Sequence, residues 1–342
     1  MSREREGLLL CLASAVGFGA MAIFAKKAYA TGLDVTTLLA VRFLMAAVLL
    51  WLLVAVRRNG VGDLRALLLG GLLGLVGYSI QAGLYFGALT HIEAGLTSLL
   101  LYTYPALVTV VAIALRRESA DRRRLGALAV ASGGVALVLA GGGVGDLDPV
   151  GVAMALGAAI FYTGYILISD GVVARTPPLA FSAAVCTGAA LTFAVLVLVD
   201  GAVTPSAEGL AWTGALTVFS TVMPIVCFFA GLALVGPSTA SIVSTIEPPV
   251  TVGLAWLVFS ETLGSVQLVG GAFVLSAVVL LQWRRTPSNS SSRSAESPPT
   301  WTSRRQSPRS APALSQAQVS ATVSDSARGT SPASAARSPD IP

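Results

Sequence analysis

The sequence predicts an all-α integral membrane protein whose ten transmembrane helices form two inverted five-helix repeats, followed by a disordered C-terminal tail. Three observations support this fold class. Only 11% of the 342 residues are charged, against roughly 25% in soluble domains. Hydrophobic residues make up 54%, and apolar runs recur from position 7 to 283. Runs of that length suit a hydrocarbon core of about 30 Å, so the composition argues against a water-soluble enzyme.

Each apolar run is interpreted as a helix, because lipid offers no partner to an unpaired backbone group and the alternation of barrel strands is missing. The first run follows Arg3 and Arg5 and could also be a secretory signal ending at Ala28-Tyr29-Ala30. We favour a helix, because the run is longer than the usual core of about 7–15 residues in a signal. The ten predicted spans are 7–25, 35–56, 66–90, 94–115, 125–145, 149–169, 177–199, 209–235, 238–260 and 262–283.

Positive charge in the short connections predicts the orientation of the helices. If the N-terminus is cytoplasmic, only Lys26 and Lys27 fall on the outer side. The basic residues that then fall on the inner side are Arg3, Arg5, Arg57, Arg58, Arg65, Arg116, Arg117, Arg122, Arg123, Arg124 and Arg175. We therefore predict a multi-pass protein of the plasma membrane with both termini in the cytoplasm.

An internal repeat appears when the chain is shifted by 143 residues, which aligns 66–138 with 209–281 without a gap. Pro105 then aligns with Pro248, and Glu118 with Glu261. Five helices per unit is an odd number, so the second unit must enter the membrane from the opposite side. This inverted architecture is typical of secondary transporters. The predicted domains are a cytoplasmic N-terminus (1–6), repeat 1 (7–145), repeat 2 (146–283) and a disordered cytoplasmic tail (284–342).

Two short motifs at equivalent places resemble the paired signatures of the drug/metabolite transporter superfamily, EamA type. They are Pro105 followed by Arg116-Arg117-Glu118, and Ile246-Glu247-Pro248-Pro249-Val250 followed by Phe259-Ser260-Glu261-Thr262-Leu263. Arg42-Phe43 resembles the early arginine of that family, while Arg117 and Ser260 replace its usual glycine. The resemblance covers about 7–283. It implies a permease that exports an amino acid, a related metabolite or a drug.

Glu247 is the most informative single residue. It falls near the middle of the ninth predicted helix, where an ionised carboxylate costs at least about 2.5–3.5 kcal/mol. One interpretation is a cavity-facing group that binds a substrate amine or takes up a proton. The other is a permanent ion pair, or a cap on backbone groups freed by Pro248 and Pro249, which cannot donate helical hydrogen bonds. Its equivalent in the first repeat is Tyr104.

Arg42 lies about two turns below the outer end of the second predicted helix, or about 12 Å deep at 1.5 Å per residue. Its guanidinium is suited to a two-pronged bond with a substrate carboxylate. Snorkelling to the headgroups and pairing with Glu247 are the alternatives. Arg42 and Glu247 together would suit a zwitterion such as an amino acid.

Polar and aromatic residues at mid-depth complete the predicted substrate site. Because residues two positions apart on one helix differ by about 200°, only one of Tyr102 and Tyr104 is expected to face a pore, and Tyr104 is favoured. Pro105, Pro224, Pro248 and Pro249 are predicted to kink their helices and to act as hinges. The substrate-binding or coupling candidates are Glu247, Arg42, Tyr104, Gln81, Tyr78, Tyr162 and Trp256, with Tyr85, Tyr102 and Tyr165 as further mid-depth residues.

The sequence contains no motif for catalysis, nucleotides, cofactors or metals, and its three cysteines all lie in apolar runs. The expected partners are a small-molecule substrate and the lipid bilayer, with protons as a hypothetical coupling ion and no nucleic acid. Three other functions stay open: transport of a sugar phosphate or nucleotide sugar, drug transport, and a membrane enzyme or non-transporting subunit. The sequence leaves the substrate, the direction of transport and the oligomeric state open.

Overall fold

A computed structural model describes residues 3–58, 60–116, 121–141, 147–173, 176–201 and 203–282. These residues form helices and no strand, which confirms the predicted all-α class. The predicted disordered tail, Glu118 and Arg117 lie outside the described residues. The elements are α1 (Arg3–Gly19), α2 (Met21–Tyr29), α3 (Val35–Arg57), α4 (Leu64–Leu73), η1 (Gly74–Tyr78), α5 (Ser79–Ala88), α6 (Ala94–Leu101), α7 (Tyr104–Ala114), α8 (Arg122–Ala140), α9 (Pro149–Val173), α10 (Pro178–Asp200), α11 (Ala207–Thr217), η2 (Val218–Val222), α12 (Met223–Ser244), α13 (Glu247–Phe259) and α14 (Ser265–Gln282).

The described helices combine into the predicted membrane spans. Nine of these helical segments are long and apolar enough to cross a bilayer, and a shorter apolar helix, Ser265–Leu281, accounts for the tenth. The first span begins at Arg3 and continues to Tyr29, four residues beyond each predicted end. Lys26 and Lys27 therefore belong to the last turns of a helix and not to a loop. Their long side chains can reach the polar boundary of the membrane from there.

The repeat seen in the sequence is also present in the backbone. The starts of α3, α4 and α8 recur 143 residues later as the starts of α10, α11 and α14. The π-helical turns η1 and η2 recur with a shift of 144 residues. The break between α6 and α7, at residues 102–103, recurs between α12 and α13 at residues 245–246. The two halves therefore share several helix starts and also the irregular turns within the helices.

The equivalent helices of the two halves run in opposite directions. The Val203 N–H near the end of α10 donates to Thr37 Oγ1 near the start of α3, at 3.3 Å. Further along α3, Trp51 Nε1 donates to Thr187 Oγ1, at 3.0 Å. As the residue number rises along α3, the number of its partner in α10 falls. The second half is therefore inverted relative to the first, as predicted.

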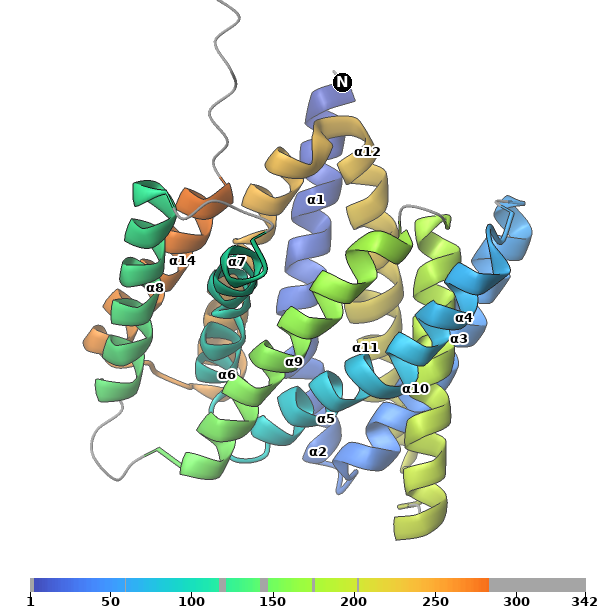
Figure 1. Ribbon diagram of the computed structural model, residues 1–342. Helices are drawn as coiled ribbons and strands as arrows, with labels where there is room; N and C mark the ends of the chain where they lie inside the picture. Colours follow the sequence, from blue (N-terminus) through green and yellow to red (C-terminus); the bar gives the residue numbers. More distant parts are fainter. Residues whose placement is uncertain are drawn as a thin grey trace, which may run out of the picture. The chain divides into compact units, whose positions relative to one another are not determined.

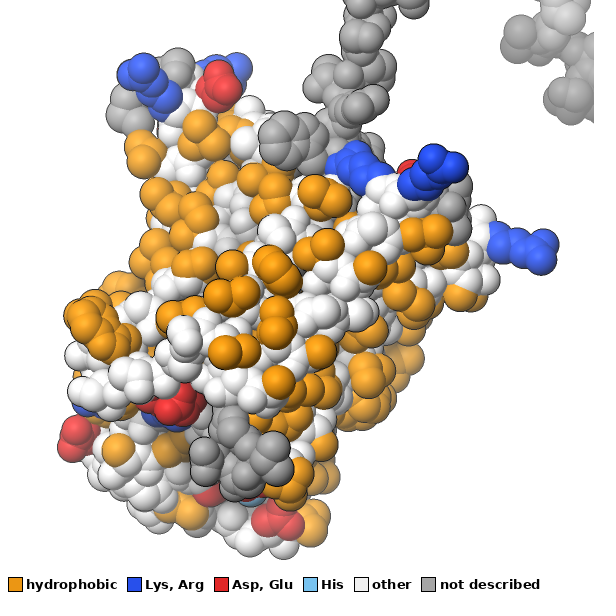
Figure 2. Space-filling model, turned by 90° about the vertical axis from the view of Figure 1, so that its left-hand side faces the viewer, with side chains coloured by type: hydrophobic (Ala, Val, Ile, Leu, Met, Phe, Trp, Pro, Cys, Tyr) orange, Lys and Arg blue, Asp and Glu red, His pale blue; other side chains and the backbone are white. Residues whose placement is uncertain are grey.

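Within the described residues, α8 and α14 lie side by side on one flank of the bundle, and α3, α4 and α10 lie on the other (Figure 1). The start of α1 and the end of α14 lie at the same end of the bundle (Figure 1). Figure 2 shows most basic side chains at that end, most acidic ones at the opposite end, and an apolar belt between them. We call the end with the start of α1 the basic end, and the end with Asp34, Glu93 and Glu261 the acidic end.

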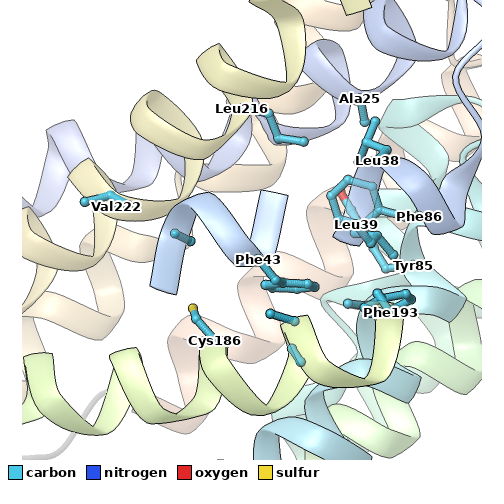
Figure 3. Packing of buried hydrophobic residues seen from close by; sticks show 14 of the residues in the cluster. Ala25, Leu38, Leu39, Phe43, Tyr85, Phe86, Cys186, Phe193, Leu216 and Val222 are labelled. Atoms are coloured by element: carbon cyan, nitrogen blue, oxygen red, sulfur yellow. The ribbon is translucent and has the colours of Figure 1, made fainter. Parts of the chain in front are cut away.

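The larger cluster of buried hydrophobic residues includes the place where α3 meets α10 and α5. Phe43 on α3 stacks on Phe193 of α10 with ring centroids 5.7 Å apart (Figure 3). Phe43 and Phe86 are almost completely buried. Because lipid tails are as apolar as these side chains, close packing and not water exclusion stabilises this contact. The same contact fixes the neighbouring Arg42 on α3.

On the opposite flank, glycine lets α8 and α14 approach closely. A Cβ added to Gly134 would lie 2.7 Å from the carbonyl oxygen of Gly270 and 2.8 Å from the backbone nitrogen of Val274. Gly133, the next residue, has nothing within 4 Å of such a Cβ. A substitution at Gly134 therefore tests both the space between the helices and the helix propensity of the new residue. The same substitution at Gly133 tests the helix propensity alone.

We expect Gly134→Val to destabilise the protein by about 1–3 kcal/mol, because α8 and α14 must move apart to hold the new side chain. The melting temperature of the detergent-solubilised protein measures this effect. Gly133→Val is the matched control and is expected to melt close to the wild type. Equal melting temperatures for the two variants would contradict the close approach of these helices.

Candidate functional site

A cavity of about 280 Å³ lies between the two repeats. It receives side chains from the mid-depth parts of helices in both halves. Six of the seven predicted site residues line it: Arg42, Tyr78, Gln81, Tyr104, Tyr162 and Glu247. The other lining residues are Phe18, Met21, Ala82, Tyr85, Phe86, Leu101, Tyr102, Tyr165, Ser182, Val185, Cys186, Ile225, Phe228 and Phe229.

Prolines explain why two helices are broken beside this cavity. Proline has no N–H, so Pro105 and Pro248 cannot donate to the carbonyl groups four residues earlier, those of Leu101 and Ser244. The helices α6 and α12 end at these residues. The breaks coincide with the kinks predicted at Pro105, Pro248 and Pro249. They place Glu247 at the first turn of α13, where the partial positive charge of the helix start favours a carboxylate.

Pro224 lies in the first turn of α12, directly after the π-helical turn η2. Within η2, the hydroxyl of Thr221 donates to the carbonyl of Leu216, five residues earlier, at 3.2 Å. In η1 of the other half, the Ser79 hydroxyl donates in the same way to the carbonyl of Gly74, at 2.7 Å. Such π-turns are frequently found at functional sites. Here they place Tyr78 at the cavity and bring Thr221 to the side chain of Arg42.

Arg42 is 1% exposed although it carries a charge at mid-depth. Its Nε donates to Thr221 Oγ1 at 3.1 Å, and its guanidinium carbon lies 4.7 Å from the ring centroid of Phe86. No acidic residue in the described part of the chain forms an ion pair with it. The snorkelling alternative does not fit a side chain that is buried against Phe86 and lines the cavity.

Glu247 faces the same cavity and does not pair with Arg42. Its Oε2 accepts a hydrogen bond from the Tyr102 hydroxyl at 2.9 Å. Among the described residues, the ion pairs are Lys26 with Glu261 and His91 with Asp148. A permanent ion pair, one of the two structural explanations for Glu247, is therefore not found in the described structure.

Tyrosine rings form a connected row along the cavity wall. The centroid of Tyr104 lies 4.7 Å from that of Tyr162 and 5.7 Å from that of Tyr102. Tyr165 continues the row, with its centroid 6.1 Å from Tyr162 and 5.4 Å from Tyr78. The row gives the site aromatic faces and hydroxyl groups at several depths.

The expectation that Tyr102 and Tyr104 cannot both face the cavity is wrong. It assumed a continuous helix, whereas the chain leaves the helix at residues 102–103 and re-enters it at Tyr104. Both tyrosines therefore line the cavity. The signal that could have revealed this is Pro105, which removes a helical hydrogen bond one turn after Leu101.

Trp256 does not belong to the site. Its side chain is 58% exposed and it is not among the cavity-lining residues. Trp256 lies nine residues beyond Glu247 on the same helix. Nine positions of about 100° place it roughly 180° away from Glu247 around the helix axis, so it points to the surface and not to the cavity.

At the acidic end, a half-buried ion pair joins three helices. Lys26 Nζ on α2 lies 2.6 Å from Glu261 Oε1, which follows α13. The other carboxylate oxygen accepts the N–H of Ala94 at the start of α6, at 2.8 Å. Burial raises the pKa of the neighbouring Glu93, and repulsion from Glu261 adds to this effect. Sequence reasoning used Glu261 as a repeat landmark and did not predict this contact.

The described residues contain no group of three or more histidine, cysteine, aspartate or glutamate side chains that could hold a metal ion. The chemistry of the cavity is therefore that of one guanidinium, one carboxyl group, an amide and several hydroxyls. Such groups can bind a small solute by hydrogen bonds and charge, and the carboxyl group can gain or lose a proton.

Two inverted repeats of apolar helices around a polar cavity are the architecture of a multi-pass membrane transporter. The profile of the EamA-like transporter family matches residues 5–140 and 149–283. The chain therefore belongs to this family, in agreement with the resemblance of its motifs. Membership places the protein in the lipid bilayer and implies a small-molecule substrate.

Two curated relatives carry transporter names. The "Uncharacterized transporter YcbK" of Bacillus subtilis is 26% identical over 306 residues, which cover 83% of this chain and 96% of that protein. The "Uncharacterized transporter sll1319" of Synechocystis is 25% identical over 210 residues, 59% of this chain and 63% of that protein. Neither name gives a substrate.

A solved crystal structure of a protein superposes on this chain with a TM-score of 0.58 and 17% sequence identity. The match covers 80% of this chain and 95% of the other. At that identity the likeness shows a shared fold.

We expect Glu261→Gln to destabilise the protein by about 1–3 kcal/mol, because the half-buried Lys26 would lose its charged partner. Thermal unfolding in detergent checks this value. Glu208→Gln is the control, since Glu208 is an exposed acid at the same end whose carboxylate accepts from Trp212 Nε1 at 3.3 Å. A Glu261→Gln variant as stable as the control would show that the ion pair contributes nothing.

Proposed function

We propose that this protein exports an amino acid or a related zwitterionic solute across the plasma membrane by alternating access. The observation that supports this function is the separation of Arg42 from Glu247. The two opposite charges line one cavity without forming an ion pair with each other. A solute with a carboxylate at one end and an amine at the other would give each of these two charges an opposite partner.

Arg42 is suited to the carboxylate of the solute. A buried guanidinium without an acidic partner is costly, and the partners of Arg42 in the described structure, Thr221, Tyr78 and Met21, are neutral groups. The remaining N–H groups can give a planar pair of hydrogen bonds to a carboxylate. Binding of an anion would therefore stabilise the buried positive charge of Arg42.

Glu247 and the tyrosine row are suited to the amine and the side chain of the solute. The carboxyl group can accept hydrogen bonds from an ammonium group, and the rings of Tyr104 and Tyr162 offer aromatic faces. The cavity volume of about 280 Å³ lies near the lower end of the roughly 300–1,000 Å³ range of ligand pockets. A single lining cation and a small volume disfavour a nucleotide sugar or a sugar phosphate.

The inverted repeats support alternating access, because two similar halves can expose one site to either side at similar energy. The ion pair of Lys26 and Glu261 joins α2, α13 and α6 at the acidic end. We infer that this contact holds the acidic end closed while the cavity exchanges solute with the basic end. Proton uptake at Glu247 is the proposed coupling step, and it requires no cofactor.

The distribution of charge supports cytoplasmic termini. Arg57 ends α3, Arg58 follows it, Arg65 lies at the start of α4, and Arg122 to Arg124 begin α8. Arginine in short connections favours the cytoplasmic side. The basic end would then face the cytoplasm, and the acidic end with Glu261 would face the outside.

Flux of a zwitterionic amino acid in proteoliposomes tests the proposed function. We expect Arg42→Gln and Glu247→Gln each to reduce uptake at low substrate concentration at least about tenfold, since each removes a charge-assisted contact worth about 1.5–3 kcal/mol. Trp256→Phe is the control, because Trp256 points away from the cavity, and it should transport like the wild type. A preference for neutral or polyanionic solutes would contradict the zwitterion assignment.

Cysteine labelling on intact cells tests the orientation. Arg65→Cys and Glu208→Cys place exposed thiols at the basic and acidic ends, in a background where Cys11, Cys186 and Cys227 are alanine. An impermeant maleimide is expected to modify only the Glu208→Cys variant before lysis and both variants after it. Modification of Arg65→Cys in intact cells would invert the assignment, and equal labelling of both would contradict the inverted topology.

A further inference from the structure

We propose that Tyr102 is a positioning residue whose single hydroxyl proton couples the protonation state of Glu247 to the break between α12 and α13. This inference rests on the proposed function, because it specifies how a proton at Glu247 would act on the helices. Tyr102 lies in the first repeat, at the break between α6 and α7, and Glu247 begins α13 in the second. The hydroxyl therefore connects the two broken helices across the repeat boundary.

The hydroxyl oxygen of Tyr102 has two acceptors at the same distance. It lies 2.9 Å from the carbonyl oxygen of Ser244 and 2.9 Å from Glu247 Oε2. A phenol has one proton to donate. It therefore cannot satisfy both acceptors at once unless one of them supplies a proton in return.

Ser244 needs this donor because of the proline that follows. In a continuous helix, its carbonyl would accept the N–H of residue 248, but Pro248 has none. Ser244 is the last residue of α12, and the next two residues, Thr245 and Ile246, form the turn before α13. An unpaired carbonyl at this depth is costly, since lipid offers no hydrogen bond. Tyr102 supplies the donor from the other repeat.

The charge of Glu247 decides which acceptor receives the proton of Tyr102. When Glu247 is ionised, its carboxylate is the stronger acceptor, so Tyr102 donates to it and the bond to Ser244 is lost. When Glu247 is protonated, its carboxyl group can donate a hydrogen bond to the Tyr102 oxygen. The Tyr102 hydroxyl then donates its own hydrogen bond to the carbonyl of Ser244. The two arrangements differ by one proton, which the carboxyl group of Glu247 exchanges with the cavity, and the hydroxyl proton of Tyr102 stays on its oxygen in both.

The two arrangements differ in the bonding of the helix break. In the protonated arrangement, the turn at residues 245–246 is tied to α6 through Ser244 and Tyr102. In the ionised arrangement, that tie is released and the carbonyl of Ser244 must find another donor, such as water or solute in the cavity. Protonation of Glu247 thereby favours one geometry of the broken helix over the other.

The other ionisable groups around this cavity do not replace Tyr102. In the described structure, no hydrogen bond joins any of them to Glu247. They come from η1, α3, α5, α7, α9 and α10 and are Arg42, Tyr78, Tyr85, Tyr104, Tyr162, Tyr165 and Cys186.

Infrared titration of the carboxyl group in the membrane-reconstituted, full-length protein tests this inference directly. The band of protonated Glu247 is identified by its loss in Glu247→Gln, and its intensity is followed against pH. Tyr102→Phe removes the donor to the carboxylate and is expected to move the midpoint to higher pH by about one unit. Pro248→Ala restores an N–H that can donate to the carbonyl of Ser244. The Tyr102 hydroxyl is then free to donate to the Glu247 carboxylate, which is expected to move the midpoint to lower pH.

Tyr104→Phe is the matched control, because it removes a hydroxyl from the same cavity that has no bond to Glu247 and should keep the wild-type midpoint. Unchanged midpoints in Tyr102→Phe and Pro248→Ala, or shifts of both in the same direction, would overturn the inference. The titration does not depend on flux. Opposite midpoint shifts without amino acid flux would therefore support the Tyr102 contact and reject the proposed substrate. Amino acid flux with unshifted midpoints would support the proposed substrate and reject the Tyr102 contact.

Discussion

Lipid offers no hydrogen bond to a carbonyl group that a proline has deprived of its helical donor. This constraint governs the breaks before Pro105 and Pro248, which must face protein or a polar cavity. Both breaks lie at equivalent positions of the two repeats, and both border the same cavity. The polar site is therefore a consequence of where the helices are interrupted. Once these two helices are broken at mid-depth, side chains from both halves can converge on the freed backbone, and a carboxylate at the start of α13 gains the favourable field of a helix N-terminus.

The two charged residues of the cavity depend on this arrangement in different ways. Arg42 belongs to the regular helix α3, and the π-turn η2 brings Thr221 to its Nε. Its guanidinium carbon lies 5.0 Å from the ring centroid of Phe43 and 4.7 Å from that of Phe86. Glu247 belongs to the broken helix, and its partner Tyr102 belongs to the other break. The cavity thus combines one charge on a regular helix with one carboxyl group at a helix break.

Much of the fold could be predicted because a bilayer imposes simple rules. Run length and low charge gave the helices, and the register of Pro105 with Pro248 gave the repeat and its inversion. Six cavity residues were predicted because charged or aromatic side chains at mid-depth have few other roles. The errors have two physical sources, an assumed continuous helix for Tyr102 and a neglected helix face for Trp256. Tyr102 was set aside because an unbroken helix would turn it away from Tyr104, and Trp256 was included although its position places it opposite Glu247.

The contact of Lys26 with Glu261 joins residues 235 positions apart, so no local pattern could reveal it.

The inverted halves are alike in backbone but differ in chemistry, and this difference has a consequence for the transport cycle. Equal scaffolds alone would make the two access states nearly equal in energy, with nothing to choose between them. The equivalents of Glu247 and Glu261 are Tyr104 and Glu118, so the titratable carboxyl group of the cavity belongs to one half only. In the proposed coupling, a proton at Glu247 would act on the break of the second repeat and leave its counterpart at Tyr104 unchanged. Symmetry of the helices keeps the energy difference between the two states small. Asymmetry of the side chains would let a bound proton or solute select one state, because a ligand shifts an equilibrium only by its difference in affinity for the two states.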